Sequence, residues 1–189
     1  MAVAIAHPGQ ALALDTDTLD YDLVDLPSNY HMAVIHSGVY RALNEGRYKI
    51  RKEECDEIKA ALGHDNICQI SDEQLEALRP LGDVLYRRAK HCVYDHRRTI
   101  EAVESLKNHK MKRLGELMNE SHISMRDDFE ITVPKVDKLV AGALTLGALG
   151  ARQTGGGFGG CIVACVPKDK VESWSAALIA QNPDAFWVA

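Results

Sequence analysis

Apolar residues recur with two different periods along the chain, and the change of period separates a strand-rich beginning from a helical middle. Apolar runs over residues 11–15, 21–26 and 30–36 are bounded by Asp, Thr, Pro, Ser and Asn residues, which is typical of strands separated by turns. The third run, YHMAVIH, is apolar at successive positions, as expected for a central strand that is buried on both faces. A short helical segment over residues 1–6 is predicted to precede these strands.

From about residue 47 the apolar positions recur every three or four residues, which predicts helices. The first helix follows Tyr48 and ends at Gly63, and Ser71 with Gln74 forms a capping box for a second, short one. Three longer helices follow, with apolar faces made by Leu85, Ala89, Cys92, His96, Thr99, Val103 and Leu106; by Met111, Leu114, Met118, Ser121 and Met125; and, after Pro134, by Val136, Leu139, Val140 and Ala143. The first row predicts one continuous packing seam, with His96 as a core or interface residue.

The last third of the chain returns to strands around a glycine-rich turn. A strand is predicted over residues 161–166, a helix with Val171, Trp174 and Leu178 on one face, and a final strand over residues 186–188. From residue 30 onward the order is strand, helices, strand, glycine turn, strand, helix, strand. This order predicts an α+β fold, with a ferredoxin-like antiparallel sheet packed against several helices.

The composition excludes several classes of protein. The 189 residues, 46% hydrophobic and 26% charged, are enough for one domain with its own core. The net charge of -5 carries no basic stripe, which argues against nucleic acid as a partner, and no apolar stretch approaches the roughly 20 residues of a membrane span. Five cysteines without a CxxC pair and eight histidines without ligand spacing predict neither a disulfide framework nor a metal site, and favour reduced thiols in the cytoplasm.

The most unusual local feature is a run of seven residues that we call the glycine loop: Thr154, Gly155, Gly156, Gly157, Phe158, Gly159 and Gly160. So many glycines raise the entropy lost on folding, and successive backbone N–H groups that approach a phosphate would explain their presence. A structural turn between two strands is the alternative. The spacing matches neither a P-loop nor a dinucleotide fingerprint, because no Lys-Ser/Thr pair follows and a strand comes next.

The stretch QTGGGFGGCIVACVP resembles the third conserved motif of the galactokinases, a branch of the GHMP small-molecule kinase superfamily. The segment SHISMRDDFEITVP, residues 121–134, resembles a galactokinase stretch that joins two helices beside the sugar-binding half. Arg51, Glu53 and Cys55 after Tyr48, and Arg98 with Glu101, fall in the order of that family. The resemblance covers nearly the whole chain.

The resemblance implies a sugar contact for Tyr48, whose alternative role is to cover the core with its ring and leave its hydroxyl in water. The family usually has Asn and a second Arg where this chain has Lys49 and Lys52. Arg126, Asp127 and Asp128 could suggest a metal site. Successive helix residues point about 100 degrees apart, so a salt-bridge group at the helix end is favoured instead.

The resemblance further implies that residues 1–189 are the C-terminal domain of a galactokinase, which with ATP and Mg²⁺ phosphorylates galactose at C1. The catalytic residues are expected just upstream of Met1, in an N-terminal half that would be this chain's partner. The chain alone is expected to be inactive, to bind no cofactor tightly, and to self-associate through the apolar surface that the missing half would cover. A sibling GHMP kinase acting on another small alcohol and a ferredoxin-like ligand-binding regulatory module are the alternatives.

Overall fold

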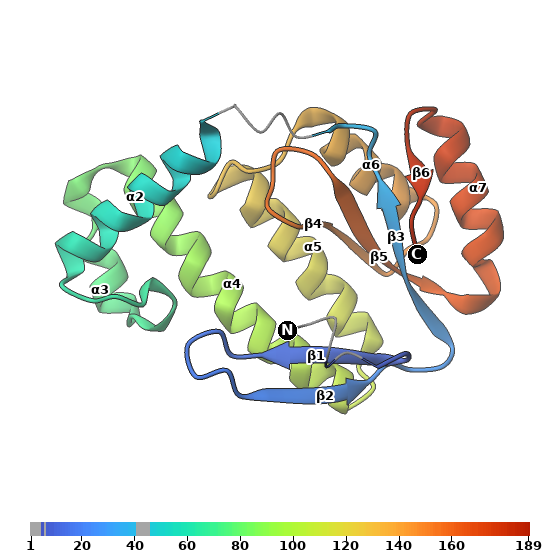
Figure 1. Ribbon diagram of the computed structural model, residues 1–189, viewed down its shortest axis with the longest axis horizontal. Helices are drawn as coiled ribbons and strands as arrows, with labels where there is room; N and C mark the ends of the chain where they lie inside the picture. The colour runs from blue at the N-terminus through green and yellow to red at the C-terminus, as the bar shows by residue number, and fades with distance from the viewer. Residues whose placement is uncertain (1–4, 6, 41–45) are drawn as a thin grey trace.

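The computed structural model of the protein describes residue 5, residues 7–40 and residues 46–189 (Figure 1). Apart from Ile5, the helical segment that the sequence predicts over residues 1–6 lies outside the described residues. No helix within the described part of the chain is long and apolar enough to cross a membrane.

A four-stranded antiparallel sheet carries the C-terminal part of the fold. Its strands, in the spatial order β4-β5-β3-β6, are β4 (Gly150–Thr154), β5 (Cys161–Pro167), β3 (Tyr30–His36) and β6 (Phe186–Trp187). This is the strand order of a ferredoxin-like fold, in which the strand before the first crossover lies between the last two. The α+β, ferredoxin-like prediction is therefore confirmed. A separate hairpin precedes the sheet and is formed by β1 (Gln10–Leu14) and β2 (Tyr21–Asp25).

Helices fill the long first crossover and cover both faces of the sheet (Figure 1). They are α2 (Arg47–Leu62), α3 (Asp72–Glu76), α4 (Asp83–Lys107), α5 (Met111–Asp127), α6 (Pro134–Thr145) and α7 (Val171–Gln181), with the short 3-10 turns η1 (Ile67–Gln69), η2 (Arg79–Leu81) and η3 (Lys168–Lys170). Gly63 caps α2 in the left-handed conformation, and Ser71 with Gln74 forms the predicted capping box of α3.

Residues on alternate faces of the strands belong to separate cores. On one face, Ile162 and Ala164 of β5 pack with Val136 and Leu139 of α6 and with Leu178 of α7. On the other face, Cys165 packs with residues from the end of α4 and from α5, and Val24 of the hairpin joins them. A third core lies at the far end of the molecule, between α2, α3, η1 and the beginning of α4.

The predicted seam of α4 is continuous only in part. Leu85, Ala89 and Leu106 are buried as predicted, whereas His96 is half-buried and Thr99 is exposed. Both line an open cavity between α4 and the β1–β2 hairpin. The prediction was wrong in the middle of the helix. The hairpin packs against the C-terminal end of α4 and leaves the middle of the helix uncovered.

Candidate functional site

The glycine loop joins β4 to β5 and has a backbone that ordinary residues rarely adopt. Positive φ angles occur at Gly155 (88°), Gly157 (83°), Gly159 (126°) and Gly160 (82°). Phe158 shares this conformation with φ 57°, in the left-handed region that disfavours a side chain. The composition of the loop therefore follows from its geometry, because glycine adopts these angles without a Cβ clash.

Two of the glycines also allow close packing that a side chain would prevent. A Cβ added at Gly157 would lie 2.9 Å from Cβ of Ile131, and one at Gly159 would lie 2.7 Å from the carbonyl oxygen of Val39. The same neighbours accept backbone hydrogen bonds from the loop, since Phe158 N–H donates to Ile131 O (2.6 Å) and Gly160 N–H to Val39 O (2.9 Å). The inner side of the loop is therefore fixed by the fold.

The outer side of the loop is accessible. Gly155 and Gly156 are exposed, and within the described part of the chain no acceptor meets their backbone N–H groups. Two successive amides on a rigid, solvent-facing turn can donate to a phosphate or carboxylate oxygen. The structure is therefore compatible with both interpretations of the glycine loop. The inner glycines are required by the packing of a structural turn, and the outer ones are available to a ligand.

Residues 128–131, within the segment that resembles the galactokinases, support the loop from behind. Ile131 O accepts a second hydrogen bond from the side-chain amide of Gln153 (3.2 Å), a fully buried residue of β4. Glu130 has a positive φ of 53°, which turns the chain from the end of α5 toward the loop. The position of the loop therefore depends on the position of this short segment.

A buried arginine holds the segment in place. Arg88, in the first half of α4, is 1% exposed. Its guanidinium donates to the carboxylates of Glu54 (2.9 Å) and Glu130 (2.7 Å) and to the carbonyl oxygen of Asp128 (2.6 Å). Arg51 adds a bond to the carbonyl oxygen of Phe129 (3.2 Å) and an ion pair with Glu54 (2.8 Å). We call these residues the arginine clamp; it connects α2, α4 and the segment behind the loop.

The surroundings of the clamp shift the pKa values of Glu130 and Arg51. The guanidinium of Arg87, at 2.7 Å, is the main cause of a lowered pKa at Glu130, and Arg88 lowers that pKa further. Burial lowers the pKa of Arg51. The lowered pKa favours the ionised carboxylate of Glu130, which accepts the charge-assisted hydrogen bonds of Arg87 and Arg88.

Tyr48 lies in the first turn of α2 and is 71% exposed. No contact joins it directly to the glycine loop among the described residues. Its neighbour Arg47 does reach the loop, with the guanidinium carbon 5.6 Å from the ring centroid of Phe158. The structure therefore brings the beginning of α2 next to the glycine loop, and leaves the hydroxyl of Tyr48 in solvent.

The charged residues at the end of α5 are engaged with separate partners. Asp127 pairs with its neighbour Arg126 at 2.7 Å, and Asp128 pairs with Lys90 of α4 at 3.0 Å. This agrees with the salt-bridge interpretation of the sequence. Among the described residues, no group of three or more His, Cys, Asp or Glu side chains is arranged to hold a metal ion.

Sequence reasoning missed the residues that support the loop. Arg88, Gln153 and the carbonyl of Ile131 were not identified, although Arg88 gave one signal: it lies three residues after Leu85, beside the apolar seam, where a charged residue must be paired. Gln153 and a backbone carbonyl give no sequence signal, because their roles depend on where two distant segments meet.

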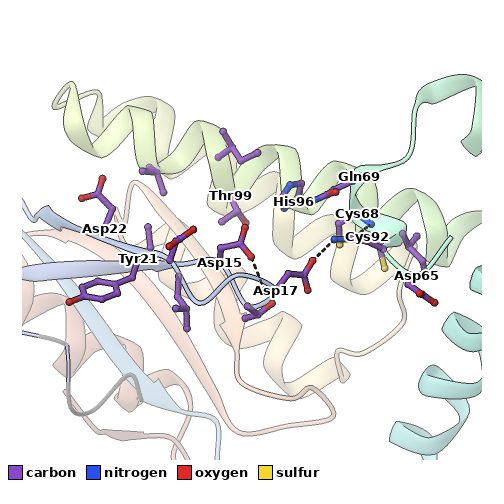
Figure 2. A pocket seen from close by; sticks show the side chains of 18 of the residues that line it. Asp15, Asp17, Tyr21, Asp22, Asp65, Cys68, Gln69, Cys92, His96 and Thr99 are labelled. Atoms are coloured by element: carbon purple, nitrogen blue, oxygen red, sulfur yellow. Dashed lines mark hydrogen bonds between the residues drawn. The ribbon is translucent and has the colours of Figure 1, made fainter.

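A separate cavity of about 1000 Å³ lies between the β1–β2 hairpin, η1, α2 and α4 (Figure 2). Its walls carry Asp15 and Asp17 of the hairpin turn, Cys68 and Gln69 of η1, and His96 of α4. The glycine loop and Tyr48 do not line it. The cavity is therefore distinct from the candidate site.

Comparison with known proteins is consistent with this arrangement. Residues 102–184 match the family described as GHMP kinases C terminal. The chain is 42% identical over 185 residues to the galactokinase of Glaesserella parasuis serovar 5 (strain SH0165), covering 95% of this chain and 48% of that protein. It is 41% identical over 185 residues to the galactokinase of Haemophilus influenzae (strain ATCC 51907 / DSM 11121 / KW20 / Rd). The chain thus spans about half the length of the curated relatives that it matches.

Solved structures extend the likeness to three dimensions. The crystal structure of Lactococcus lactis galactokinase complexed with galactose is similar with a TM-score of 0.86 and 32% identity, covering 95% of this chain and 50% of that one. The crystal structure of L. major mevalonate kinase in complex with R-mevalonate has a TM-score of 0.62 at 18% identity. The second likeness concerns the fold alone.

Proposed function

We propose that this chain, which belongs to the GHMP kinase family and carries the C-terminal domain of a galactokinase, serves an enzyme that phosphorylates galactose at C1 with ATP. The observation that carries the proposal is the 42% identity to a galactokinase over 95% of this chain. The structure supports it because Arg47, next to Tyr48 in the first turn of α2, lies 5.6 Å from the ring of Phe158 in the glycine loop.

Each part has a role that its chemistry allows. The exposed amides of Gly155 and Gly156 would donate to an oxygen of the nucleotide phosphates or of the phosphorylated sugar. The hydroxyl of Tyr48, which faces solvent, would contact the sugar, and its ring would limit where the sugar lies. The arginine clamp contributes by keeping the glycine loop in position, and it does not need to touch a substrate.

The described residues fit a phosphate group better than they fit a metal ion. The loop supplies N–H donors, but no cluster of carboxylates is arranged to bind Mg²⁺ within the described ranges. We therefore assign no step to Mg²⁺ on this chain. In the proposed enzyme ATP supplies the phosphoryl group, while the metal ligands and the catalytic base would come from the N-terminal half, the proposed partner within the same polypeptide.

The surface and the thiols support two further parts of the proposal. Phe186, Trp187 and Val188, at the edge strand β6, are between 39% and 51% exposed, which supports self-association of the chain when it is isolated. Sedimentation velocity at rising concentration measures this self-association, and a monomer at every concentration would contradict it.

The cysteines form no disulfide, which supports a cytoplasmic location.

Steady-state kinetics test the proposed function in the galactokinase-length enzyme that contains this chain. ATP consumption is expected with galactose and is not expected with mevalonate or homoserine. Tyr48→Phe should raise KM for galactose about tenfold, the equivalent of one lost hydrogen bond, and leave KM for ATP unchanged. Tyr21→Phe is the matched control, because Tyr21 is an exposed tyrosine on the hairpin that does not belong to the site.

The alternatives have their own outcomes. Turnover of mevalonate or homoserine without turnover of galactose would assign the chain to a sibling kinase. An enzyme that consumes ATP with none of the three substrates, yet binds one of them, would favour the regulatory module. Unchanged kinetics in Tyr48→Phe would remove Tyr48 from the sugar site and leave the rest of the proposal standing.

A further inference from the structure

Two cysteines from different helices meet at the wall of the hairpin cavity. Cys55 lies in α2 and Cys92 in α4, and the two thiols share a hydrogen bond. Both are half-buried and pack against the third core, which includes Ile58 and Ala89. Both also line the open cavity, so a small molecule in solvent can reach them. Figure 2 shows Cys92 there, with Cys68 of η1 beside it.

The shared hydrogen bond makes the two sulfur atoms chemically unequal. The thiol of Cys92 donates to Cys55, which lowers the pKa of Cys55 to about 7 against the opposing effect of burial. The same hydrogen bond, together with burial, raises the pKa of Cys92. Near pH 7 the Cys55 thiol is therefore about half ionised, whereas Cys92 keeps its proton. This combination has a nucleophile and a second thiol in contact with it, as reactive dithiols require.

We propose that Cys55 and Cys92 are a redox modification site, which a peroxide oxidises to a disulfide between α2 and α4. The Cys55 thiolate attacks one oxygen of hydrogen peroxide, the O–O bond breaks, and hydroxide leaves as a sulfenic acid forms on Cys55. The Cys92 sulfur then attacks the Cys55 sulfur. An S–S bond forms, the S–O bond breaks, and the oxygen leaves as water with the proton from Cys92. The two cysteines lose two electrons, and the hydroxide takes up the proton that Cys55 released on ionising, so that one peroxide yields two waters.

The remaining cysteines are less suited to this chemistry. Cys165 is completely buried in the sheet, and burial raises its pKa to about 11. Cys68 lines the same cavity, but burial raises its pKa above the ordinary value. Cys161 lies on β5, directly after the glycine loop and opposite Thr154 and His36, and it does not line the cavity. Cys68 is therefore the competitor that an experiment has to separate from Cys92.

A disulfide at this position would connect two helices that also hold the arginine clamp. Cys55 directly follows Glu54, whose carboxylate binds Arg88 and Arg51. Cys92 is four residues after Arg88 on the same helix. Oxidation would thus fix α2, and with it the segment that carries Tyr48, to α4. The proposal does not depend on the kinase function, because the bond can be detected in an inactive protein.

Peptide mapping tests the site in the full chain. The reduced protein is treated with a few equivalents of hydrogen peroxide at neutral pH, remaining thiols are alkylated, and the digest is analysed by mass spectrometry. Two of the five thiols should become resistant to alkylation, in a linked peptide pair that contains Cys55 and Cys92, and a reducing agent should restore both. Cys161→Ser, the matched control, should give the same linked pair, whereas Cys55→Ser and Cys92→Ser should not.

The result that would overturn the proposal is equally direct. A folded chain that keeps all five thiols, or that links Cys55 to Cys68 or to another molecule, contradicts it. The wild-type map decides this even where a serine variant fails to fold. Failure of the kinase proposal would show as absent turnover with an intact map, so the two failures can be distinguished.

The pH dependence of alkylation gives a second readout. Cys55 should react with iodoacetamide half-maximally near pH 7 in the wild type and at higher pH in Cys92→Ala under reducing conditions, because alanine removes the thiol donor. The charged and titratable groups around the pair are Glu54, Asp56, Lys59, Cys68 and Asp95. None of them changes in this variant, so an unchanged profile would overturn the assigned role of Cys92.

Discussion

The two halves of α4 border regions that are packed in opposite ways. Near its beginning, Arg88 is buried with each of its hydrogen-bond partners in place, and the segment behind the glycine loop is held from two helices. In the second half of the helix, His96 and Thr99 face an open cavity. The same helix, with one apolar periodicity, therefore contributes both to the arginine clamp behind the glycine loop and to the wall of the open cavity. Periodicity determines which side of a helix is apolar, and the neighbours determine whether that side is covered.

Removing the buried arginine should give the largest effect on this contrast. Arg88→Ala leaves Glu54 and Glu130 without their cation and the carbonyl of Asp128 without its donor. We expect a loss of about 3–5 kcal/mol in the free energy of unfolding, the usual result of breaking a buried ion pair from one side. Urea unfolding measures it. Arg113→Ala is the control, because Arg113 also pairs with several glutamates but at the surface, and it should change stability little.

Substitution in the glycine loop should have the next largest effect. Gly157→Ala combines a positive φ of 83° with a Cβ only 2.9 Å from Ile131. We expect a loss of about 2–3 kcal/mol from backbone strain together with overpacking. Gly147→Ala isolates the strain, since Gly147 has φ 101° but no atom within 4 Å of an added Cβ, and it should lose about 1 kcal/mol. Equal losses in the two variants would show that packing against Ile131 does not constrain the loop.

These two regions also mark what the sequence could predict. The order of strands and helices, the capping box at Ser71 and the buried face of α5 followed from periodicity and capping chemistry, which act over a few residues. The glycine loop was found for the same reason, since its composition is local. The clamp was not found, because Arg88 meets Glu130 across 42 residues of sequence. The cavity was not found either, because the coverage of α4 depends on where the hairpin packs.

A pH titration should distinguish the packed half of α4 through His91. This residue is buried, stacks on Phe129 and lies 3.0 Å from Oγ of Ser124, and burial lowers its pKa to about 4. The unfolded chain binds a proton near pH 6.5, so this contribution to stability is present above that pH and is lost as the pH falls toward 4. At pH 5 the loss should be about 2 kcal/mol. His91→Gln should remove this part of the pH dependence, measured by urea unfolding at pH 7.5 and 5.

The smallest effect should come from the histidine on the cavity side. His96 lies five residues after His91 on the same helix, but it is half-buried and lines the open cavity. His96→Gln should therefore change the free energy of unfolding by less than about 0.5 kcal/mol at pH 7.5, as substitutions on a solvated surface usually do. A clearly larger loss in urea unfolding would mean that the cavity wall is as tightly packed as the beginning of α4, and the contrast between the two halves of α4 would not hold.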